Sequence, residues 1–591
     1  DPGEQVRIGT LTTTGLSALP FDAAERATRA IDFRSGDAFD EDEYEKAKLD
    51  VANALADVGY AFVRVNGKAR VDLSEHRASI TLDVTPGPRA RFGPIVIQGL
   101  REVPEKPVRD TLLLHEGEYY SQSELEGART ALFQLGVFSK VDVLPDTSAP
   151  DGAIVPVTIR LEEAPLRSVT AGFGAKLDVQ RLAATGRVGW TDRNFLGGLR
   201  KLSISTRPGL TFYPTRIDHL EWPTKVLPEN SLTVRLEQPS LIEGRTLGFV
   251  ETGYNVYPLL YPLADGADPK LERIIGYNEV TAQVGVSRSF WGRTLPVSLS
   301  MNWRSNFPFT YQGSLDEVPG LEPVIVAYPD LTTGLDLRDN PISPTRGIFL
   351  SNSFQIAGPF LGGVLTDVRI RPEARAFYPL DYSRKVILAA RVTFGFVFPQ
   401  DYGSTLTGGA VTNPLDPDVV RDQHKLLFRA FYSGGPDSNR GYPYQRIGPQ
   451  GPIGFLLPAG ANCAAATPDP GCIRPLGGFT LWEASLELRY RFAEPWGFVW
   501  FIDASDVNAG VASINFMAPH ISTGPGIRYA SPIGPLRLDL GWRVPGLQQF
   551  SPQPGEPPDV SEVPPYYNTE EGRPENWFDA FAWQILIGEA F

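Results

Sequence analysis

From about Leu166 to Phe591 the sequence alternates between apolar and polar residues with a period of two, and this alternation is what most restricts the fold. One apolar row consists of Leu388, Ala390, Val392, Phe394, Phe396 and Phe398. Another consists of Ala484, Leu486, Leu488, Tyr490 and Phe492, and its opposite row is Ser485, Glu487, Arg489 and Arg491. Because successive side chains of a strand point to opposite faces, such runs predict β-strands with one apolar and one polar face.

Two architectures can use strands of this kind. In a membrane barrel, strands of about 9 to 11 residues are apolar outside and polar inside; in a soluble sandwich or propeller, the polar rows face water. The barrel is favoured because the strands are long, aromatic residues gather near strand ends, and connecting segments such as Tyr402 to Gln423 are long and polar. No apolar run reaches the roughly 18 to 20 residues of a membrane-spanning helix.

The charge and the N-terminus restrict the function further. The formal net charge is -14, which argues against nucleic acid as a partner because phosphate binding needs a basic surface. The sequence begins at Asp1 without the apolar region of a signal peptide, as expected of a mature or trimmed chain.

Residues 5 to 163 have a different, mixed helix and strand pattern that occurs twice. Arg7-Ile8-Gly9 followed by Gly15-Leu16 recurs as Arg91-Phe92-Gly93 followed by Gly99-Leu100, an offset of 84 residues. In each copy a short helical stretch, a longer amphipathic helix and two strands follow. The sequence therefore predicts two copies of one α+β unit before the all-β region.

No enzyme motif is found in the sequence. The five histidines are scattered, and there is no His-Glu-x-x-His pair, no Gly-x-Ser-x-Gly elbow and no P-loop. The charged row Asp367, Arg369, Arg371, Glu373 and Arg375 is interpreted as a solvated barrel wall rather than a lumenal active site. We therefore expect no enzyme activity, no cofactor and no metal.

Cys463 and Cys472 are the only cysteines, and they lie close together in a segment rich in glycine, proline and alanine. They can close a small disulfide loop in an oxidising compartment, or they can be free thiols.

Asn439-Arg440-Gly441-Tyr442 lies in a segment rich in glycine and proline, Gly434 to Gly451, between two predicted barrel strands. Its arginine either faces water as a solvated loop charge or folds back into the polar lumen. In the second case the arginine needs carboxylate partners, because a guanidinium inside a narrow lumen loses much of its hydration.

These features together resemble the bacterial outer-membrane assembly factors of the BamA and TamA superfamily, in which periplasmic POTRA domains precede a barrel of sixteen antiparallel strands. Arg440-Gly441-Tyr442 is similar to the Arg-Gly-aromatic motif of the family's sixth extracellular loop, which folds into the lumen. Glu487 and Asp503 stand at acidic positions of the following strands. A penultimate hairpin motif is matched by Gly524, Gly526, Arg528, Ser531, Pro532, Gly534, Pro535, Arg537 and Asp539.

The resemblance implies three domains: POTRA domains at residues 1–86 and 87–163, and a transmembrane barrel at 164–591 with an in-folded loop around 434–478. Loops of this type can carry a disulfide at the place of Cys463 and Cys472. The TamA-like branch is preferred because of the Arg-Gly-Tyr form of the loop motif, the fit of residues 88 to 163 to the barrel-proximal POTRA domain, and the ending Ile587-Gly588-Glu589-Ala590-Phe591.

Two hypotheses about sites follow. Arg440 binds Glu487, Asp503 or both, since these carboxylates fall on the lumen side of strands whose other face is apolar. Gly172, Gly174, Gly588 and the terminal Phe591 mark a weakly paired seam between the first and last strands, because glycine packs nothing and costs entropy in a strand. The alternative for the glycines is that they only relieve crowding at closure.

The expected function is an outer-membrane assembly or translocation factor that inserts or exports β-barrel clients through this seam. Its POTRA domains would bind clients and periplasmic partners by strand addition. The resemblance implies a bacterial outer-membrane location with the POTRA domains in the periplasm. As partners it implies outer-membrane lipids, barrel or autotransporter clients, and a TamB-like protein or, in the BamA case, assembly lipoproteins. The alternatives are an export pore of the two-partner-secretion type and a passive porin-like channel.

Overall fold

The computed structural model describes residues 5–148, 153–177, 181–215, 220–261, 268–292, 294–316, 318–381, 383–407, 411, 413–458, 463, 472–493, 495–517, 519–531, 534–544, 567–568, 573–574 and 580–587. The chain divides into two compact units. The first holds Asp1–Ser168 together with the turns Asp192–Lys201 and Gln238–Thr246, and the second holds the rest.

The first α+β repeat packs helices on a three-stranded sheet. Its elements are β1 (Arg7–Thr14), η1 (Leu16–Ala18), α1 (Phe21–Arg29), α2 (Glu41–Ala56), β2 (Arg64–Asp72) and β3 (Arg77–Thr85). The strand order is β1-β3-β2, with β1 parallel and β2 antiparallel to β3. Helix α2 begins where the Asp40 carboxylate accepts hydrogen bonds from the backbone N–H groups of Asp42 and Glu43, a typical N-cap.

The second repeat has the same architecture. Its elements are β4 (Arg91–Gln98), α3 (Glu105–Leu112), α4 (Gln122–Gln134), β5 (Phe138–Pro145) and β6 (Ile154–Glu163), with the strand order β4-β6-β5. The Ser121 hydroxyl caps α4 by accepting from the backbone N–H of Glu124. Leu199, from a turn that follows much later in the chain, is buried in the hydrophobic core of this repeat.

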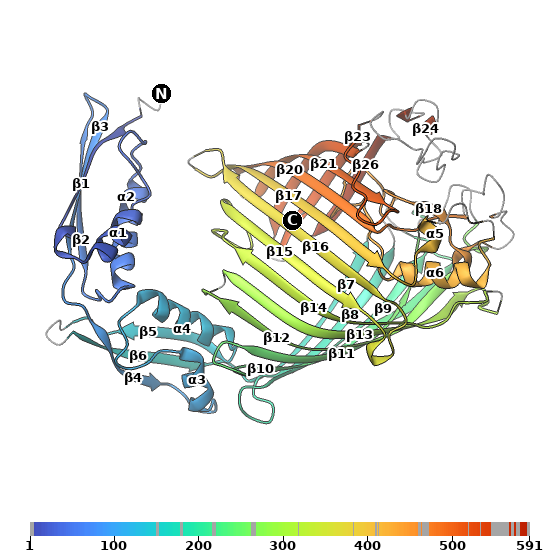
Figure 1. Cartoon of the computed structure of the whole chain (residues 1–591), viewed down its shortest axis with the longest axis horizontal. Helices are drawn as coiled ribbons and strands as arrows, with labels where there is room; N and C mark the ends of the chain where they lie inside the picture. Colours follow the sequence, from blue (N-terminus) through green and yellow to red (C-terminus); the bar gives the residue numbers. More distant parts are fainter. Residues whose placement is uncertain are drawn as a thin grey trace. The chain divides into compact units, whose positions relative to one another are not determined.

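Sixteen strands form the second architecture, one continuous sheet (Figure 1). Its first strands are β7 (Arg167–Leu177), β8 (Leu182–Asp192), β9 (Lys201–Tyr213), β10 (Lys225–Gln238), β11 (Leu247–Pro258), β12 (Ile274–Phe290), β13 (Leu295–Gln312) and β14 (Val324–Asp336). They are followed by β15 (Gly347–Ala357), β16 (Asp367–Pro379), β17 (Val386–Pro399), β20 (Thr480–Ala493), β21 (Trp496–Asn508), β22 (His520–Ser531), β23 (Gly534–Arg543) and β26 (Phe581–Ile587). The predicted fold class, α+β units followed by a sixteen-stranded antiparallel sheet, is confirmed.

The alternation of the sequence sets the two faces of the sheet. On β20, Leu486 and Leu488 are both 42% exposed, whereas Glu487 between them is fully buried. The apolar row therefore lies on the outside and the polar row inside the curved sheet. Strands β12 and β13 have 17 and 18 residues and pair with each other along their full length. They are longer than the roughly 9 to 11 residues that a membrane barrel requires of a strand.

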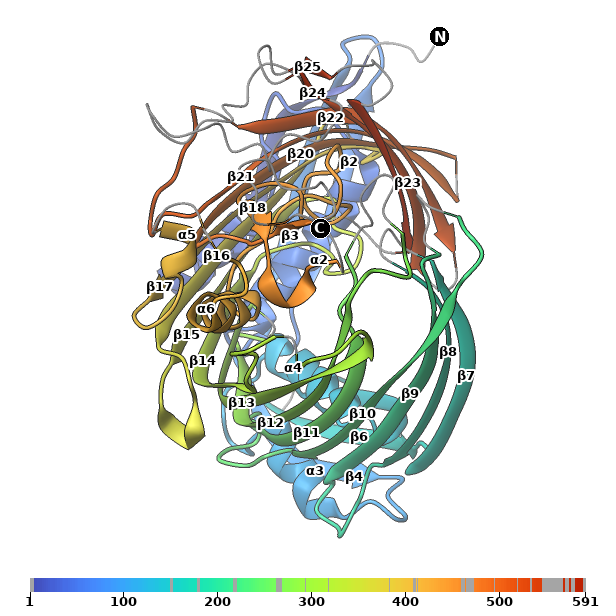
Figure 2. The ribbon, with the colours of Figure 1, turned by 90° about the vertical axis from the view of Figure 1, so that its right-hand side faces the viewer.

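The two edges of the sheet are β7 and β26, the first and last strands in the chain. The sheet curls round so that both edges come to the same side in Figure 2. Within the residues that the structure describes, no hydrogen-bonded pairing joins β7 to β26, and the sheet is open there. Within the described residues, β26 pairs with β23 from Phe581 opposite Trp542 to Ile587 opposite Leu536.

The segment between β17 and β20 is folded rather than extended. It contains α5 (Ser404–Thr407), α6 (Pro417–Leu427), β18 (Gln450–Pro452), η4 (Gly454–Leu456) and β19 (Ile473–Pro475). Two further short elements are η3 (Phe360–Gly362) and the pair β24 (Tyr567–Asn568) with β25 (Arg573–Pro574). None of the helices in the described part of the chain has the length and hydropathy that crossing a bilayer requires.

Candidate functional site

Arg440 and Arg537 have the largest of the fully buried side chains among the described residues, although Arg440 lies in a loop. It reaches the inner wall because two glycines let backbones cross there. A Cβ at Gly441 would lie 2.3 Å from the Cβ of Ser522 on β22, and a Cβ at Gly541 on β23 would lie 2.7 Å from the carbonyl carbon of Arg440. The Arg-Gly pair therefore brings the loop into direct contact with strands β22 and β23.

The guanidinium of Arg440 binds both carboxylates that the sequence singled out. Its Nε donates to Asp503 Oδ2 (2.7 Å) and its Nη2 donates to Asp503 Oδ1 (2.7 Å), a planar two-point contact. Its Nη1 donates to Glu487 Oε1 (2.5 Å), and its Nη2 also donates to the Ser485 hydroxyl (3.1 Å). The ring of Phe501 lies 3.7 Å from the guanidinium carbon. The side chains of Arg440, Glu487 and Asp503 are each 1% exposed.

The hairpin-motif residues extend this contact into a network. Glu487 also accepts from Arg489 (2.8 Å), and Asp539 accepts from Arg528 (2.7 Å). Arg537 donates to the loop itself, at the carbonyl of Pro436 (2.8 Å) and the carboxylate of Asp437 (2.7 Å). Four guanidiniums thus meet three buried carboxylates and the carboxylate of Asp437, which is 72% exposed.

The residues around Arg440 hold the loop backbone. The Asn439 amide donates to the His520 carbonyl (2.7 Å) and accepts from the Ser522 hydroxyl (2.6 Å). Ser522 in turn accepts from the Gly441 N–H (3.0 Å), and Arg543 donates to the Gly441 carbonyl (2.7 Å). The loop is therefore bonded through its backbone as well as through its charge.

Two hairpin glycines make room for this arrangement. A Cβ at Gly524 would lie 1.8 Å from the carbonyl oxygen of Leu540 on the next strand, and a Cβ at Gly526 would lie 2.1 Å from Asp539 Oδ1. Side chains at these positions would displace β23 or its carboxylate.

Several predicted positions lie elsewhere or outside the described residues. Gly534 and Pro535 belong to β23, where they pair with Ser531 and Ala530. On β7, a Cβ at Gly172 would meet no atom within 4 Å, and a Cβ at Gly174 would meet only the Thr185 hydroxyl at 3.8 Å. The remaining predicted residues, Pro532, Gly588 and Phe591, lie outside the described residues.

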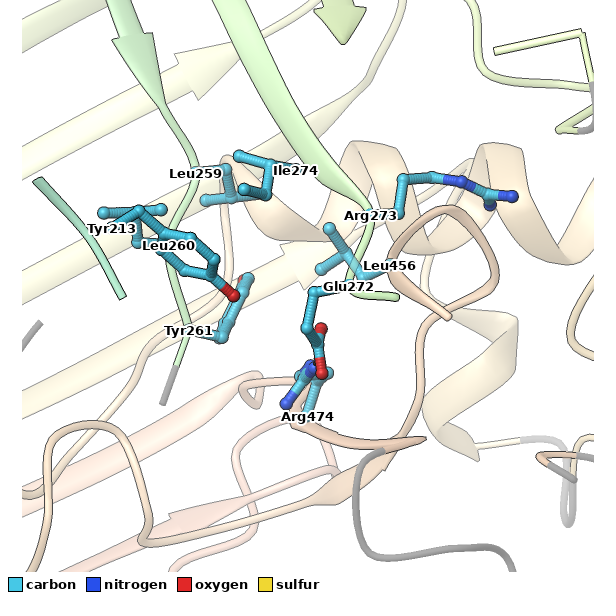
Figure 3. A pocket seen from close by; sticks show the side chains of 9 residues that line it. All are labelled: Tyr213, Leu259, Leu260, Tyr261, Glu272, Arg273, Ile274, Leu456 and Arg474. Atoms are coloured by element: carbon cyan, nitrogen blue, oxygen red, sulfur yellow. The ribbon is translucent and has the colours of Figure 1, made fainter. Parts of the chain in front are cut away.

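Cys463 and Cys472 form a disulfide in the same long loop, with their Cα atoms 5.5 Å apart. A buried ion pair lies directly after it, where Arg474 Nη2 donates to Glu272 Oε2 (2.8 Å). Figure 3 shows the Glu272 carboxylate turned toward Arg474 at the edge of a small cavity that Tyr261 and Leu456 also line.

Sequence reasoning missed two kinds of residue. The first kind comprises the hydroxyl, amide and aromatic partners of the Arg440 segment, which are Ser485, Phe501, Ser522 and the side chain of Asn439. The lumen parity of Ser485 and Ser522 could have suggested them. The second kind comprises the buried polar residues of α6 and their partners.

The expectation of a solvated wall is wrong at Asp367, which is 1% exposed because the loop covers it.

The α+β repeats, the sixteen-stranded sheet and the loop fixed inside it define a class, a β-barrel protein preceded by α+β modules. A family model described as "Omp85 superfamily domain" matches residues 245–551, and one described as "POTRA, Surface antigen variable number repeat" matches residues 6–87 and 90–164. The chain belongs to the Omp85 superfamily. Membership points to the outer membrane, and to insertion or export of proteins there in general.

One solved structure supports the fold, and a second shows a similarity. The chain is similar to the crystal structure of BamA from Haemophilus ducreyi lacking POTRA domains 1-3, with a TM-score of 0.50 and 15% identity over 92% of this chain and 96% of that chain. CdiB from Acinetobacter baumannii gives a TM-score of 0.47 and 13% identity, over 92% of this chain and 87% of that one.

Proposed function

We propose that this chain inserts β-barrel client proteins into the bacterial outer membrane at the edge between β7 and β26, without enzymatic chemistry. In this proposal the Arg440 network braces the barrel from inside. The proposal rests on one observation: the same loop forms hydrogen bonds with three neighbouring strands. It bonds to Asp503 on β21, Ser522 on β22 and Arg537 on β23. The strands leading to the β26 edge are thereby held together without the help of closure.

The edge strands supply the unpaired backbone groups with which a client strand can form hydrogen bonds. A strand edge presents unpaired N–H and C=O groups, on which another strand can pair. Gly172 and Gly174 on β7, which pack little against the described residues, support an edge that exchanges partners easily. In the alternative, these glycines only relieve crowding where the two edges close.

The POTRA repeats would handle clients and partners in the periplasm. Each of their sheets leaves edge strands, and β2 of the first repeat is exposed along most of its length. Strand addition to such an edge is a general mode of peptide recognition. We place the chain in the TamA-like branch, with a TamB-like periplasmic protein as partner, and co-purification of native partners tests this against assembly lipoproteins.

A cross-linking experiment tests the insertion edge. Cysteines replacing Gly172 and Gly588 are expected to cross-link under oxidation and to stop folding of a barrel client in liposomes. A matched control cross-links an interior pair, Ile527→Cys with Leu538→Cys, because these residues are register partners and both face outward. Insertion that continues despite complete cross-linking at 172 and 588 would reject the proposal.

The export-pore alternative makes a different prediction in the same liposomes. A pore would conduct ions once residues 433–447 of the loop are deleted, while client folding would stay at the background rate. An insertase instead needs that loop for client folding, because the loop holds together the strands next to the β26 edge.

A further inference from the structure

We propose that the loop between β17 and β20 has two separately latched parts, and that Arg429 is the positioning residue of the second latch. The tip, residues 433–447, is latched by Arg440. The cover, residues 413–431 and 448–458, is latched by Arg429 on Asp367 and stays in place when the tip is released. This inference rests on the proposed function, because it assigns the bracing to the tip and the shielding of the lumen to the cover.

The tip is closed on itself at its base. A backbone bridge joins Ser433 to Ile447, whose N–H donates to the Ser433 carbonyl (3.2 Å). Gly434 and Gly448 flank this bridge with φ angles of 98° and 102°, a backbone conformation that residues with side chains rarely adopt. The tip therefore begins and ends at positions where the chain direction can change without moving the cover.

The cover has its own buried charge contact. Arg429 is 3% exposed and binds both oxygens of Asp367 on β16, through Nε (2.8 Å) and Nη2 (2.5 Å). Its Nη1 donates to Gln355 on β15 (3.0 Å), and the Tyr402 hydroxyl donates to Asp367 (2.7 Å). This contact shares no residue with the Arg440 network, and it lies on a different part of the barrel wall.

Helix α6 is fixed from several other sides. Three consecutive buried polar residues bond three separate segments: Asp422 accepts from Thr405 N (2.8 Å), Gln423 accepts from Gly454 N (3.1 Å), and His424 shares a hydrogen bond with the Tyr277 hydroxyl on β12 (2.9 Å). Because buried polar groups must keep their partners, α6 cannot move far without losing all three contacts.

The surfaces under the two parts also differ. Between the cover and the wall, Val397 of β17 shares one buried apolar cluster with Leu426 and Phe431 of the cover. Beneath the tip, the wall carries carboxylates, guanidiniums and hydroxyls, such as Ser505. Water can replace the tip on its polar wall, whereas removal of the cover exposes apolar surface. The tip is thus the part that can leave first.

Two reporter cysteines separate the latches. Val397→Cys lies under the cover, where Val397 is fully buried, and Ser505→Cys lies under the tip, where Ser505 is 1% exposed. Each is placed in otherwise wild-type protein and in Arg440→Ala and Arg429→Ala backgrounds, and labelling by a water-soluble maleimide is followed. The native cysteines stay in their disulfide. We expect Arg440→Ala to speed labelling at 505 at least tenfold and at 397 less than twofold, and Arg429→Ala to speed labelling at 397 at least tenfold.

Equal acceleration at 397 and 505 in the Arg440→Ala protein would overturn the proposal, because the loop would then leave as one body. Unchanged labelling at 397 in the Arg429→Ala protein would also overturn it. The exchanged pair Arg429→Asp with Asp367→Arg should restore protection at 397, which a merely destabilised barrel would not show. If Arg429→Ala does not fold, Tyr402→Phe serves in its place, because it removes only one hydrogen bond to Asp367. Its labelling rate at 397 should lie between the wild-type rate and the rate expected for Arg429→Ala. Labelling needs no client, so its outcome is independent of the insertion assay.

Discussion

Replacing Asp503 by alanine removes the central partner of the loop arginine. Asp503 accepts from Nε, Nη2 and the backbone N–H of Arg440 and from the Ser485 hydroxyl, all between 2.6 and 3.1 Å. In the Asp503→Ala protein, Arg440 keeps its bond to Glu487 but remains 1% exposed without its two-point partner. Breaking a buried ion pair by removal of one partner costs about 3 to 5 kcal/mol.

That cost should appear as opening of the tip. At tenfold per 1.4 kcal/mol, the open fraction rises about a hundredfold to a few thousandfold. Arg440 and Arg446 both lie in the tip and become trypsin sites when it opens. Because cleavage follows the open population when reclosing is fast, the rate of tryptic cleavage in the tip should rise by the same factor.

Ile502→Ala is the matched control on the same strand, since Ile502 faces outward and is 46% exposed. We expect its tip cleavage to stay within twofold of the wild-type rate. Heat-modified electrophoretic mobility would verify that both variants keep a folded barrel. Equal cleavage rates in Asp503→Ala and Ile502→Ala would refute the reasoning, because Arg440 would then not hold the loop.

Three further predictions concern single positions. Gly441→Ala places a Cβ 2.3 Å from that of Ser522 and should cost about 1 to 3 kcal/mol of tip closure, with Ser522→Gly restoring part of the tryptic protection. Gly526→Ala places a Cβ 2.1 Å from Asp539 Oδ1 and should lower the temperature at which heat-modified mobility is lost; unchanged mobility would contradict the close approach. Burial acts to raise the pKa of Glu163, but backbone N–H bonds from Arg101, Glu102 and Val103 outweigh it and hold this pKa below 4.5. The stabilisation by the ionised Glu163 is therefore complete above pH 4.5 and is lost as the pH falls through the folded pKa. In the wild-type protein, amide exchange at residues 101–103 should rise in acid, and Glu163→Gln should abolish this rise. A rise that persists in Glu163→Gln would exclude Glu163 as its cause.

The parity of the sequence, together with the resemblance to the family's loop motif, was enough to predict the two carboxylates that bind Arg440. On β20 and β21, the alternation alone assigns Glu487 and Asp503 to the polar face, and the carboxylate-arginine chemistry then pairs them with the loop. The strand lengths of β12 and β13 could not be read in the same way. The pairing of β12 with β13 runs from Ile274 opposite Gln312 to Phe290 opposite Leu295, well past the alternating apolar stretch.

The cover could not be predicted because its polar residues resemble those of a solvated loop. Asp422, Gln423 and His424 are buried only by contacts with segments that are distant in sequence, such as Tyr277 on β12. Likewise, 62 residues separate Arg429 from Asp367, and no local pattern links them. Contacts of this type depend on how the loop folds back over the strands. Hydrophobic periodicity and secondary-structure propensity do not encode this path.

The burial of Leu199 has a consequence for the order of folding. This leucine lies in the turn between β8 and β9, yet it is 3% exposed and belongs to the hydrophobic core of the second α+β repeat, which also contains Phe138 and Leu132. During synthesis the repeat emerges first, and it lacks this core side chain until the chain has been made past β8. A fragment ending at Glu163 would therefore have an incomplete hydrophobic core, and the repeat gains its full core only after Leu199 has been translated.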